Sequence, residues 1–164
     1  MQMLKNFSAA RWWGLLLAGL FVVLDFVTKL WALGLQQEII PVIDGFFNFR
    51  LAFNRGVSFS FLSDIQSAYL PMFLGGLAFT VSIFFIWWMG HEDGKLFKTG
   101  VACMLGGALG NGIDRFSYGV VVDFLDFYYG SWHYPTFNVA DIVIFVGVGC
   151  ILLDAFTSRE QKEK

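Results

Sequence analysis

The sequence predicts a mainly α-helical membrane protein with four transmembrane helices and a small extracytoplasmic β-sheet cradle. Of its 164 residues, 57% are hydrophobic and 15% are charged, whereas a soluble domain carries about 25% charged residues. The excess of apolar side chains must therefore face lipid. Four apolar segments approach the roughly 20 residues that cross a bilayer as a helix. They lie at about residues 12–33, 69–89, 96–113 and 137–156, and the third is the shortest.

Residues 1–164 are expected to form a single domain, because no internal repeat, low-complexity tract or linker interrupts them. Basic side chains flank one side of the four segments at Lys5, Arg11, Lys95, Lys98, Arg159, Lys162 and Lys164. The other side has Arg50, Arg55 and Arg115. Because basic flanks stay in the cytoplasm, we expect both termini inside the cell and the connections 34–68 and 114–136 outside.

Charge and cysteine content argue against two kinds of site. The net charge is −2 and no extended basic run is present, which argues against nucleic-acid binding. Cys103 and Cys150 fall in predicted helices and lack the CxxC or Cys/His spacing that is typical of a metal site. We therefore expect no bound metal, and we interpret both cysteines as small buried side chains.

The connection between the first two segments contains a predicted strand over Phe46–Asn54. Its apolar residues alternate with polar ones, a period of two that indicates a half-buried strand. Asn54-Arg55-Gly56 then supplies a turn signal, and alternation resumes over Val57–Phe61 as a returning strand would show. We expect a sheet on the outer membrane surface, with its polar face open to a ligand. The alternative is an interfacial hairpin that has only a packing role.

Asp123 and Asp141 lie within the apolar sequences VVVDFLDFY and FNVADIVIFVG. An ionisable group at membrane depth costs roughly 2.5 kcal/mol or more, so it marks function by default. Two carboxyl groups can share a proton and activate water, which predicts an intramembrane aspartic protease. Asp126 is a rival to Asp123 by position, and a proton-coupled transporter is a second interpretation of the same residues.

The start of the fourth segment suggests how the two carboxyl groups differ. Asn138 is expected to cap the fourth helix by accepting a backbone N–H bond. The helix N-terminus then favours an ionised Asp141, whereas apolar walls around Asp123 favour its protonated form.

Two further groups of residues lie near this pair. Asp25 and Lys29 are four residues apart on one helix face, so they can pair, and we expect a structural role for them. At the end of the third segment, Gly106 and Gly110 have the GxxxG spacing that permits close helix contact. Asn111, Asp114 and Arg115 follow. Arg115 is expected either to pair with Asp114 or to donate to a carbonyl oxygen of a bound peptide.

Five motifs in this order resemble the lipoprotein signal peptidase family, also called signal peptidase II. They are DFVTK at 25–29, NRGVSFS at 54–60, GGALGNGIDR at 106–115, VVDF at 121–124 and FNVAD at 137–141. Each motif alone is weak, but their order and spacing match the family from the first predicted helix to the fourth.

The resemblance implies a multi-pass aspartic endopeptidase of the bacterial cytoplasmic (inner) membrane, with its active site near the outer, periplasmic face. Such enzymes cut diacylglyceryl-modified prolipoproteins just before the lipidated cysteine. The motifs imply that Asp123 and Asp141 are catalytic, so Asp126 loses its claim. The residues implied to line or support the site are Asn54, Gly56, Asn111, Asp114, Arg115, Asn138, Asp25 and Lys29. The resemblance also implies no metal or organic cofactor, contact with membrane lipid, and a monomer.

Three other interpretations fit some of the residues. A transporter or channel would use Asp25, Asp123 and Asp141 as a proton relay, although the sequence lacks the inverted repeat of many transporters. A non-enzymatic assembly factor would use the GxxxG surface alone. A different intramembrane aspartic protease would be expected to carry a GxGD signature, which is missing here.

Overall fold

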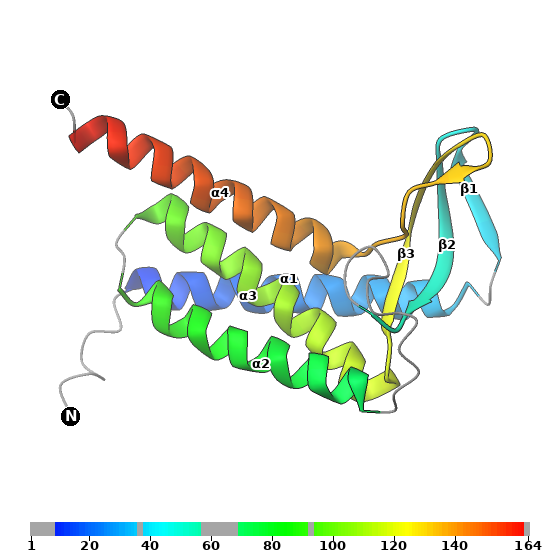
Figure 1. Ribbon diagram of the computed structural model, residues 1–164, viewed down its shortest axis with the longest axis horizontal. Coiled ribbons are helices and arrows are strands. Elements are labelled where there is room, and N and C mark those ends of the chain that lie inside the picture. Colours follow the sequence, from blue (N-terminus) through cyan, green and yellow to red (C-terminus); the bar gives the residue numbers. More distant parts are fainter. Residues whose placement is uncertain (1–8, 36–37, 57–68, 92–93, 163–164) are drawn as a thin grey trace.

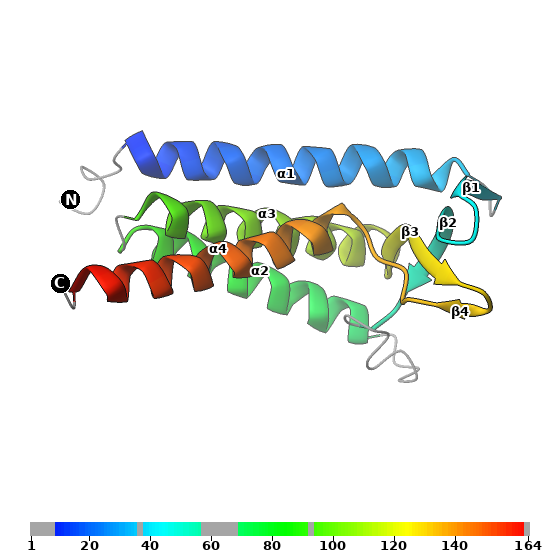
Figure 2. The same ribbon diagram turned by 90° about the horizontal axis from the view of Figure 1, so that it is seen from above.

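The computed structural model describes residues 9–35, 38–56, 69–91 and 94–162, which form a helical bundle with a sheet at one end (Figure 1). The helices are α1 (Ala9–Leu33), α2 (Leu70–Met89), α3 (Lys95–Tyr118) and α4 (Val139–Lys162). The strands are β1 (Ile39–Ile43), β2 (Phe47–Asn54), β3 (Val121–Tyr129) and β4 (Trp132–His133). They pair antiparallel in the order β1-β2-β3-β4. The start of α1 and the end of α4 lie at the end of the bundle opposite the sheet (Figure 2).

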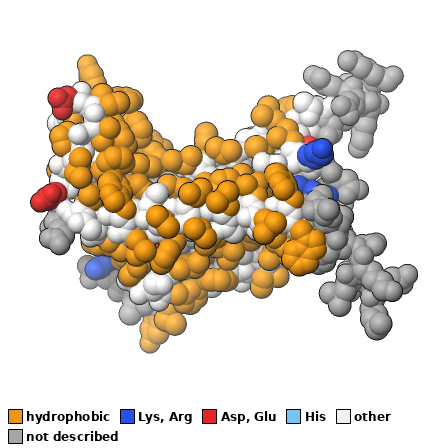
Figure 3. All heavy atoms as spheres, turned by 180° about the vertical axis from the view of Figure 1, so that it is seen from behind, with side chains coloured by type: hydrophobic (Ala, Val, Ile, Leu, Met, Phe, Trp, Pro, Cys, Tyr) orange, Lys and Arg blue, Asp and Glu red, His pale blue; other side chains and the backbone are white. Residues whose placement is uncertain are grey.

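Three helices are apolar and long enough to cross a membrane: Trp12–Leu33, Leu70–Met89 and Val139–Thr157. Their outer faces carry large exposed side chains, for example Leu16 at 73% and Phe145 at 81% exposure. In Figure 3, hydrophobic side chains cover the middle of the molecule, while charged side chains lie towards its two ends. This distribution suits a bilayer, since apolar surface faces lipid and charges reach the interfaces.

The central helix, α3, packs against α1, α2 and α4. It is less apolar than its neighbours because it contains charged residues at both ends, and most of its residues are buried within the protein. At 24 residues it is long enough to span the membrane, yet its composition does not identify it as a span. The predicted count of four spans therefore stays a prediction.

Glycines let the backbone of α3 touch its neighbours. A Cβ atom at Gly147 of α4 would lie 2.6 Å from the carbonyl oxygen of Gly100, and one at Gly106 would lie 2.9 Å from that of Ala18 in α1. Both distances are too short for any side chain. The close helix contact predicted from the spacing of Gly106 and Gly110 is therefore confirmed, and it joins α3 to α1.

Two helices continue past the C-terminal ends of their predicted segments. α3 continues past residue 113 to Tyr118, where Gly119 ends it with a positive φ of 71°, as a C-terminal glycine commonly does. α4 continues past residue 156 to Lys162. The predicted bounds of the spans themselves stay a prediction, and Asp114, which follows Ile113, is buried within the protein.

The predicted strand over Phe46–Asn54 is confirmed as β2, but its described neighbours are β1 and β3, which the sequence pattern did not predict. The predicted returning strand over Val57–Phe61 lies outside the described residues. The pairing of β2 with β3 shifts register between Phe49 and Ala52. A bulge of this kind interrupts simple alternation, so Phe49 packs on Trp31 while Phe53 stays 53% exposed.

We predict that Gly147→Ala lowers the free energy of unfolding by roughly 1–3 kcal/mol, as overpacking does. The matched control is Gly149→Ala on the same helix, where an added Cβ meets no atom within 4 Å. The control should be neutral or stabilising by about 0.5–1 kcal/mol, because alanine favours helix. Thermal unfolding in detergent measures both, and equal effects would contradict close packing between α3 and α4.

Candidate functional site

The residues singled out from the sequence meet where α3 ends, β3 begins and α4 starts. Asn111 lies on α3, Asp123 on β3, and Asn138 directly precedes α4. Asn138 is fully buried, Asp123 is 2% exposed, and Asp141 is partly buried in the first turn of α4. Residues separated by up to 30 positions in the sequence therefore form one polar cluster beside the bundle.

Asn138 holds the N-terminus of α4 and one carboxylate at the same time. Its side-chain Oδ1 accepts the N–H of Asp141 at 3.0 Å, while the Asp141 carboxylate accepts the N–H of Asn138 at 3.2 Å. This reciprocal pair is a capping box, so the predicted cap is confirmed. The Asn138 amide also donates to Asp123 Oδ1 at 2.7 Å.

Asn111 completes the connection between the two aspartates. Its Nδ2 donates to Asp141 Oδ1 at 2.9 Å, and its Oδ1 accepts from the Asn138 amide at 3.0 Å. The two carboxylates are thus joined through two side-chain amides, Asp123 to Asn138 to Asn111 to Asp141. Such amides have fixed donor and acceptor directions, so they hold both acids in one arrangement.

A buried ion-pair cluster supports Asn111 from behind. Lys29 Nζ lies 2.7 Å from Asp25 and 2.9 Å from Asp114, and it donates to Asn111 Oδ1 at 3.0 Å. The predicted pairing of Asp25 with Lys29 is therefore confirmed. All three charged side chains are at most 4% exposed, and buried charges persist only when they are paired.

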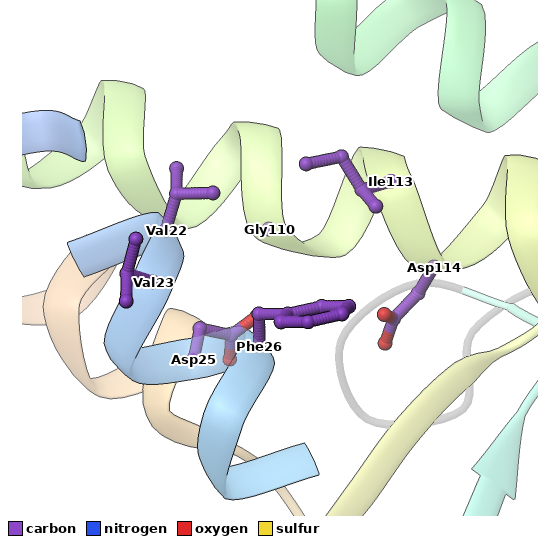
Figure 4. A pocket seen from close by; sticks show the side chains of 7 residues that line it. All are labelled: Val22, Val23, Asp25, Phe26, Gly110, Ile113 and Asp114. Atoms are coloured by element: carbon purple, nitrogen blue, oxygen red, sulfur yellow. The ribbon is translucent and has the colours of Figure 1, made fainter. Parts of the chain in front are cut away.

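The carboxylates of this cluster also bind the two backbone segments that carry the aspartates. Asp25 accepts the N–H of Ala140 at 2.9 Å, and Asp114 accepts the N–H of Val122 at 3.0 Å. Figure 4 shows Asp25 on α1 and Asp114 on α3 beside a cavity of about 220 Å³ between the two helices. The cluster therefore positions the residue that precedes each aspartate.

Arg115 binds backbone carbonyls and does not form the predicted pair with Asp114. Its guanidinium donates to the carbonyl of Gly56 at 2.8 Å and to that of Asn111 at 3.1 Å. Asp114 is paired with Lys29 instead, because the α3 helix carries adjacent residues to different faces. Asn54 accepts the N–H of Gly56 at 3.0 Å, so the segment after β2 is held at the edge of the site.

Asp126 lies apart from this polar cluster. Its carboxylate contacts Arg50 at 3.2 Å and His133 at 2.9 Å. The structure therefore places Asp126 in a separate ion-pair group of the sheet.

Burial, and to a smaller extent the negative charge of Asp141, raise the pKa of Asp123 to about 7. Hydrogen bonding from Asn54 and Asn138 and the charge of Lys29 act in the opposite direction, since they stabilise the ionised form. Desolvation is the largest of these effects. Near neutral pH, therefore, Asp123 holds a proton for much of the time, as its apolar surroundings predict.

Within the described ranges, no group of three or more His, Cys, Asp or Glu side chains is arranged to hold a metal ion. Cys103 is buried and Cys150 is partly buried, and both are free thiols. The arrangement suits acid–base chemistry: two linked carboxyl groups, one with a raised pKa and one at a helix N-terminus, beside buried cations.

A family model described as "Signal peptidase (SPase) II" matches residues 17–157. The chain belongs to the signal peptidase II family. It is 43% identical to a lipoprotein signal peptidase of Histophilus somni (strain 2336) over 146 residues, covering 85% of this chain and 86% of that one. A lipoprotein signal peptidase of Yersinia pestis (strain Pestoides F) is 40% identical over 159 residues, covering 94% and 92%.

Two solved structures of bacterial membrane enzymes have the same fold. One, at 2.3 Å resolution, has a TM-score of 0.76 and 26% identity, and the match covers 91% of this chain and 90% of that one. The other, at 1.9 Å, has a TM-score of 0.72 and 27% identity, with 87% and 91% covered. This signal peptidase is thus a membrane protease that processes lipoproteins, which excludes the transporter and assembly-factor interpretations.

Sequence reasoning missed the backbone groups of the site. The backbone N–H groups of Val122 and Ala140 donate to the carboxylates of Asp114 and Asp25. The side chains of Val122 and Ala140 take no part in these bonds, so no sequence motif indicates them. Sequence reasoning also did not single out His133, whose imidazole contacts the Asp126 carboxylate. The sequence showed an aromatic neighbourhood, but not the buried partner 7 residues away.

We predict that Lys29→Met destabilises the protein by roughly 3–5 kcal/mol, because it leaves two buried carboxylates without their cation. Thr28→Val is the matched control, since the Thr28 hydroxyl bonds only to carbonyls of its own helix among the described residues. Thermal unfolding of the purified proteins compares them. An unchanged melting temperature for Lys29→Met would show that the cluster does not stabilise the fold.

Proposed function

We propose that this protein is an intramembrane aspartic endopeptidase in which Asp123 and Asp141 activate water. It removes the signal peptide of diacylglyceryl-modified prolipoproteins by cutting just before the lipidated cysteine. The observation that carries this proposal is the bridge of two amides, Asn138 and Asn111, that links the two carboxylates. Family membership supports the substrate class.

The two aspartates divide the acid and base roles according to their surroundings. Asp141 lies in the first turn of α4, where its carboxylate accepts the Asn138 N–H and the Asn111 amide, and we assign it the role of the base. It takes a proton from water, and the resulting hydroxide attacks the scissile carbonyl carbon. Asp123, with its raised pKa, holds a proton that polarises the carbonyl oxygen and then passes to the leaving amine. This chemistry needs two carboxyl groups and water, without a metal or organic cofactor.

The supporting residues keep this pair in position. Lys29, Asp25 and Asp114 fix the backbone beside both aspartates, as their hydrogen bonds to Val122 and Ala140 indicate. A monomeric enzyme is part of the same proposal. In the same proposal, Arg115 keeps the segment at Gly56 against the site and provides positive charge close to the peptide.

An apolar stripe on α4 supports docking of a signal helix. Phe145, Val148 and Leu152 follow Asp141 at helical spacing and are 81%, 40% and 53% exposed. A stripe at positions 4, 7 and 11 after Asp141 lies on one helix face. An apolar signal helix packed along it would present its outer end to the two aspartates, while the substrate's acyl chains stay in membrane lipid.

The proposed orientation places four spans in the bacterial inner membrane, with both termini in the cytoplasm and the site near the periplasmic face. The aspartates lie near the sheet end of the bundle, opposite the start of α1 (Figure 1). α3 begins at Lys95 and α4 ends at Lys162 at the other end, and basic residues at that end agree with a cytoplasmic location for it.

We predict that Asp123→Asn and Asp141→Asn each abolish cleavage of a diacylglyceryl-modified prolipoprotein by purified enzyme in detergent. Either substitution removes a proton donor or acceptor that the pair requires. Asp126→Asn should retain measurable cleavage, because that carboxylate lies in a separate group. A gel mobility shift of the substrate measures the product. Cleavage by a folded Asp123→Asn or Asp141→Asn protein would overturn the assignment of the pair.

We predict that the maximal rate of cleavage falls as pH rises through about 7, the raised pKa of Asp123. Above that pH Asp123 loses the proton that it must donate, so the sign of the change is a loss at alkaline pH. A profile of kcat from mildly acidic to mildly alkaline pH measures it, with substrate solubility checked at each point. A rate that rises steadily across this range would contradict the role of Asp123 as the acid.

A further inference from the structure

The proposed mechanism leaves one buried carboxylate unexplained. Asp126 is 0% exposed, and it lies three residues from Asp123 on the same strand. Its Oδ1 is 3.2 Å from Arg50 Nη2 on β2 and 2.9 Å from His133 Nδ1 on β4. A buried charge is costly unless it is paired and hydrogen-bonded. Through its two partners, Asp126 joins β3 to β2 and to β4.

The same guanidinium reaches the segment that leads into α4. Arg50 Nη2 also donates to Thr136 Oγ1 at 3.2 Å. Thr136 lies two residues before Asn138, the residue that caps α4 and donates to Asp123. Asp126, Arg50 and Thr136 thus connect the sheet to the segment that carries both Asn138 and Asp141.

The backbone of this segment pairs irregularly with β3. The carbonyl of Phe137 accepts from two successive N–H groups, those of Phe124 at 3.0 Å and Leu125 at 2.9 Å, and the Phe137 N–H donates to the Leu125 carbonyl at 3.2 Å. One carbonyl opposite two N–H groups is a bulge-like arrangement, in which the strand ladder is locally disrupted. Three backbone hydrogen bonds thus tie Phe137 to β3, and the contact of Thr136 with Arg50 adds a side-chain link to β2 beside them.

We propose that Asp126, Arg50 and Thr136 form a clamp that positions Asn138 between the two catalytic aspartates. The inference rests on the proposed function of Asp123 and Asp141. The clamp touches neither substrate nor reacting atoms, so its members are positioning residues. Its effect on catalysis follows from geometry, because a misplacement of about 1 Å at a catalytic group can cost roughly 100-fold in rate.

The test compares three clamp variants with one control of the same sheet. Asp126→Leu and Thr136→Val remove clamp contacts, whereas Asp126→Asn keeps the shape and one acceptor oxygen. Tyr128→Phe is the control: it removes the hydrogen bond from the Gly45 N–H to the Tyr128 hydroxyl and retains the ring that stacks on His133. Melting temperature, kcat, KM and the pH profile of kcat are measured for each protein with a lipidated prolipoprotein.

We expect kcat per folded enzyme to fall roughly 10- to 100-fold in Asp126→Leu and severalfold in Thr136→Val, with KM unchanged. Asp126→Asn should recover most of the loss, and Tyr128→Phe should match wild type. The alkaline limb of the pH profile should move to higher pH in the clamp variants. The hydrogen bond from Asn138 lowers the pKa of Asp123. That pKa therefore rises when Asn138 is displaced, because the other charged groups that face the site, Asp141, Lys29 and Arg115, remain in place.

Two results would overturn the clamp. One is a lower melting temperature in the clamp variants with unchanged kcat and an unchanged pH limb, since that is a structural role alone. The other is a loss of rate in Tyr128→Phe equal to that in Thr136→Val. If Asp126→Leu does not fold, Thr136→Val tests the clamp instead. Thr136 is buried less deeply than Asp126, and valine is nearly isosteric with threonine. Failure of the proposed function itself is distinguishable, because Asp123→Asn and Asp141→Asn would then cleave substrate.

Discussion

The ammonium group of Lys29 is the contact on which the site depends. It lies within 3.0 Å of oxygens on Asp25, Asp114 and Asn111, so one cation joins α1 to α3 and to the amide bridge of the site. Four carboxylates, those of Asp25, Asp114, Asp123 and Asp141, lie in or beside the site, and repulsion between them would separate the elements that carry them. Lys29 supplies the compensating charge where water cannot. It therefore links the packing of α1 on α3 to the arrangement of the aspartates.

In this bundle, the close packing of the helices makes the hydrogen bonds of buried polar groups possible. Glycines on α3 bring its backbone against α1 and α4, and this short separation lets the Asp25 carboxylate reach the Ala140 N–H on α4. In lipid, association relies on close van der Waals contact and on interhelical hydrogen bonds. A side chain in place of Gly110 would collide with Asp25 itself. The small residues thus permit the hydrogen bonds that hold the site.

The sequence predicted the local features of the site well. Asn138 was recognisable as a helix cap, and Asp25 with Lys29 as a pair, because both contacts span three or four residues. Contacts between distant residues were less visible. Arg115 was assigned Asp114 as a possible partner because they are neighbours in sequence, whereas the helix directs them to Gly56 and Lys29. Likewise β2 was recognised as a strand, but its pairing with β3, about 75 residues later, has no local signal.

What the sequence determined by itself is the class of molecule: apolar segments of bilayer length that contain few charges, and two aspartates in apolar surroundings. These follow from composition and local periodicity, since the cost of placing a charge in lipid holds for any fold. Only the tertiary structure decided which polar groups meet. The link from Asp123 through Asn138 and Asn111 to Asp141 depends on how α3, β3 and α4 converge. That convergence is set by long-range packing, because glycine contacts and the central lysine act between helices rather than along them.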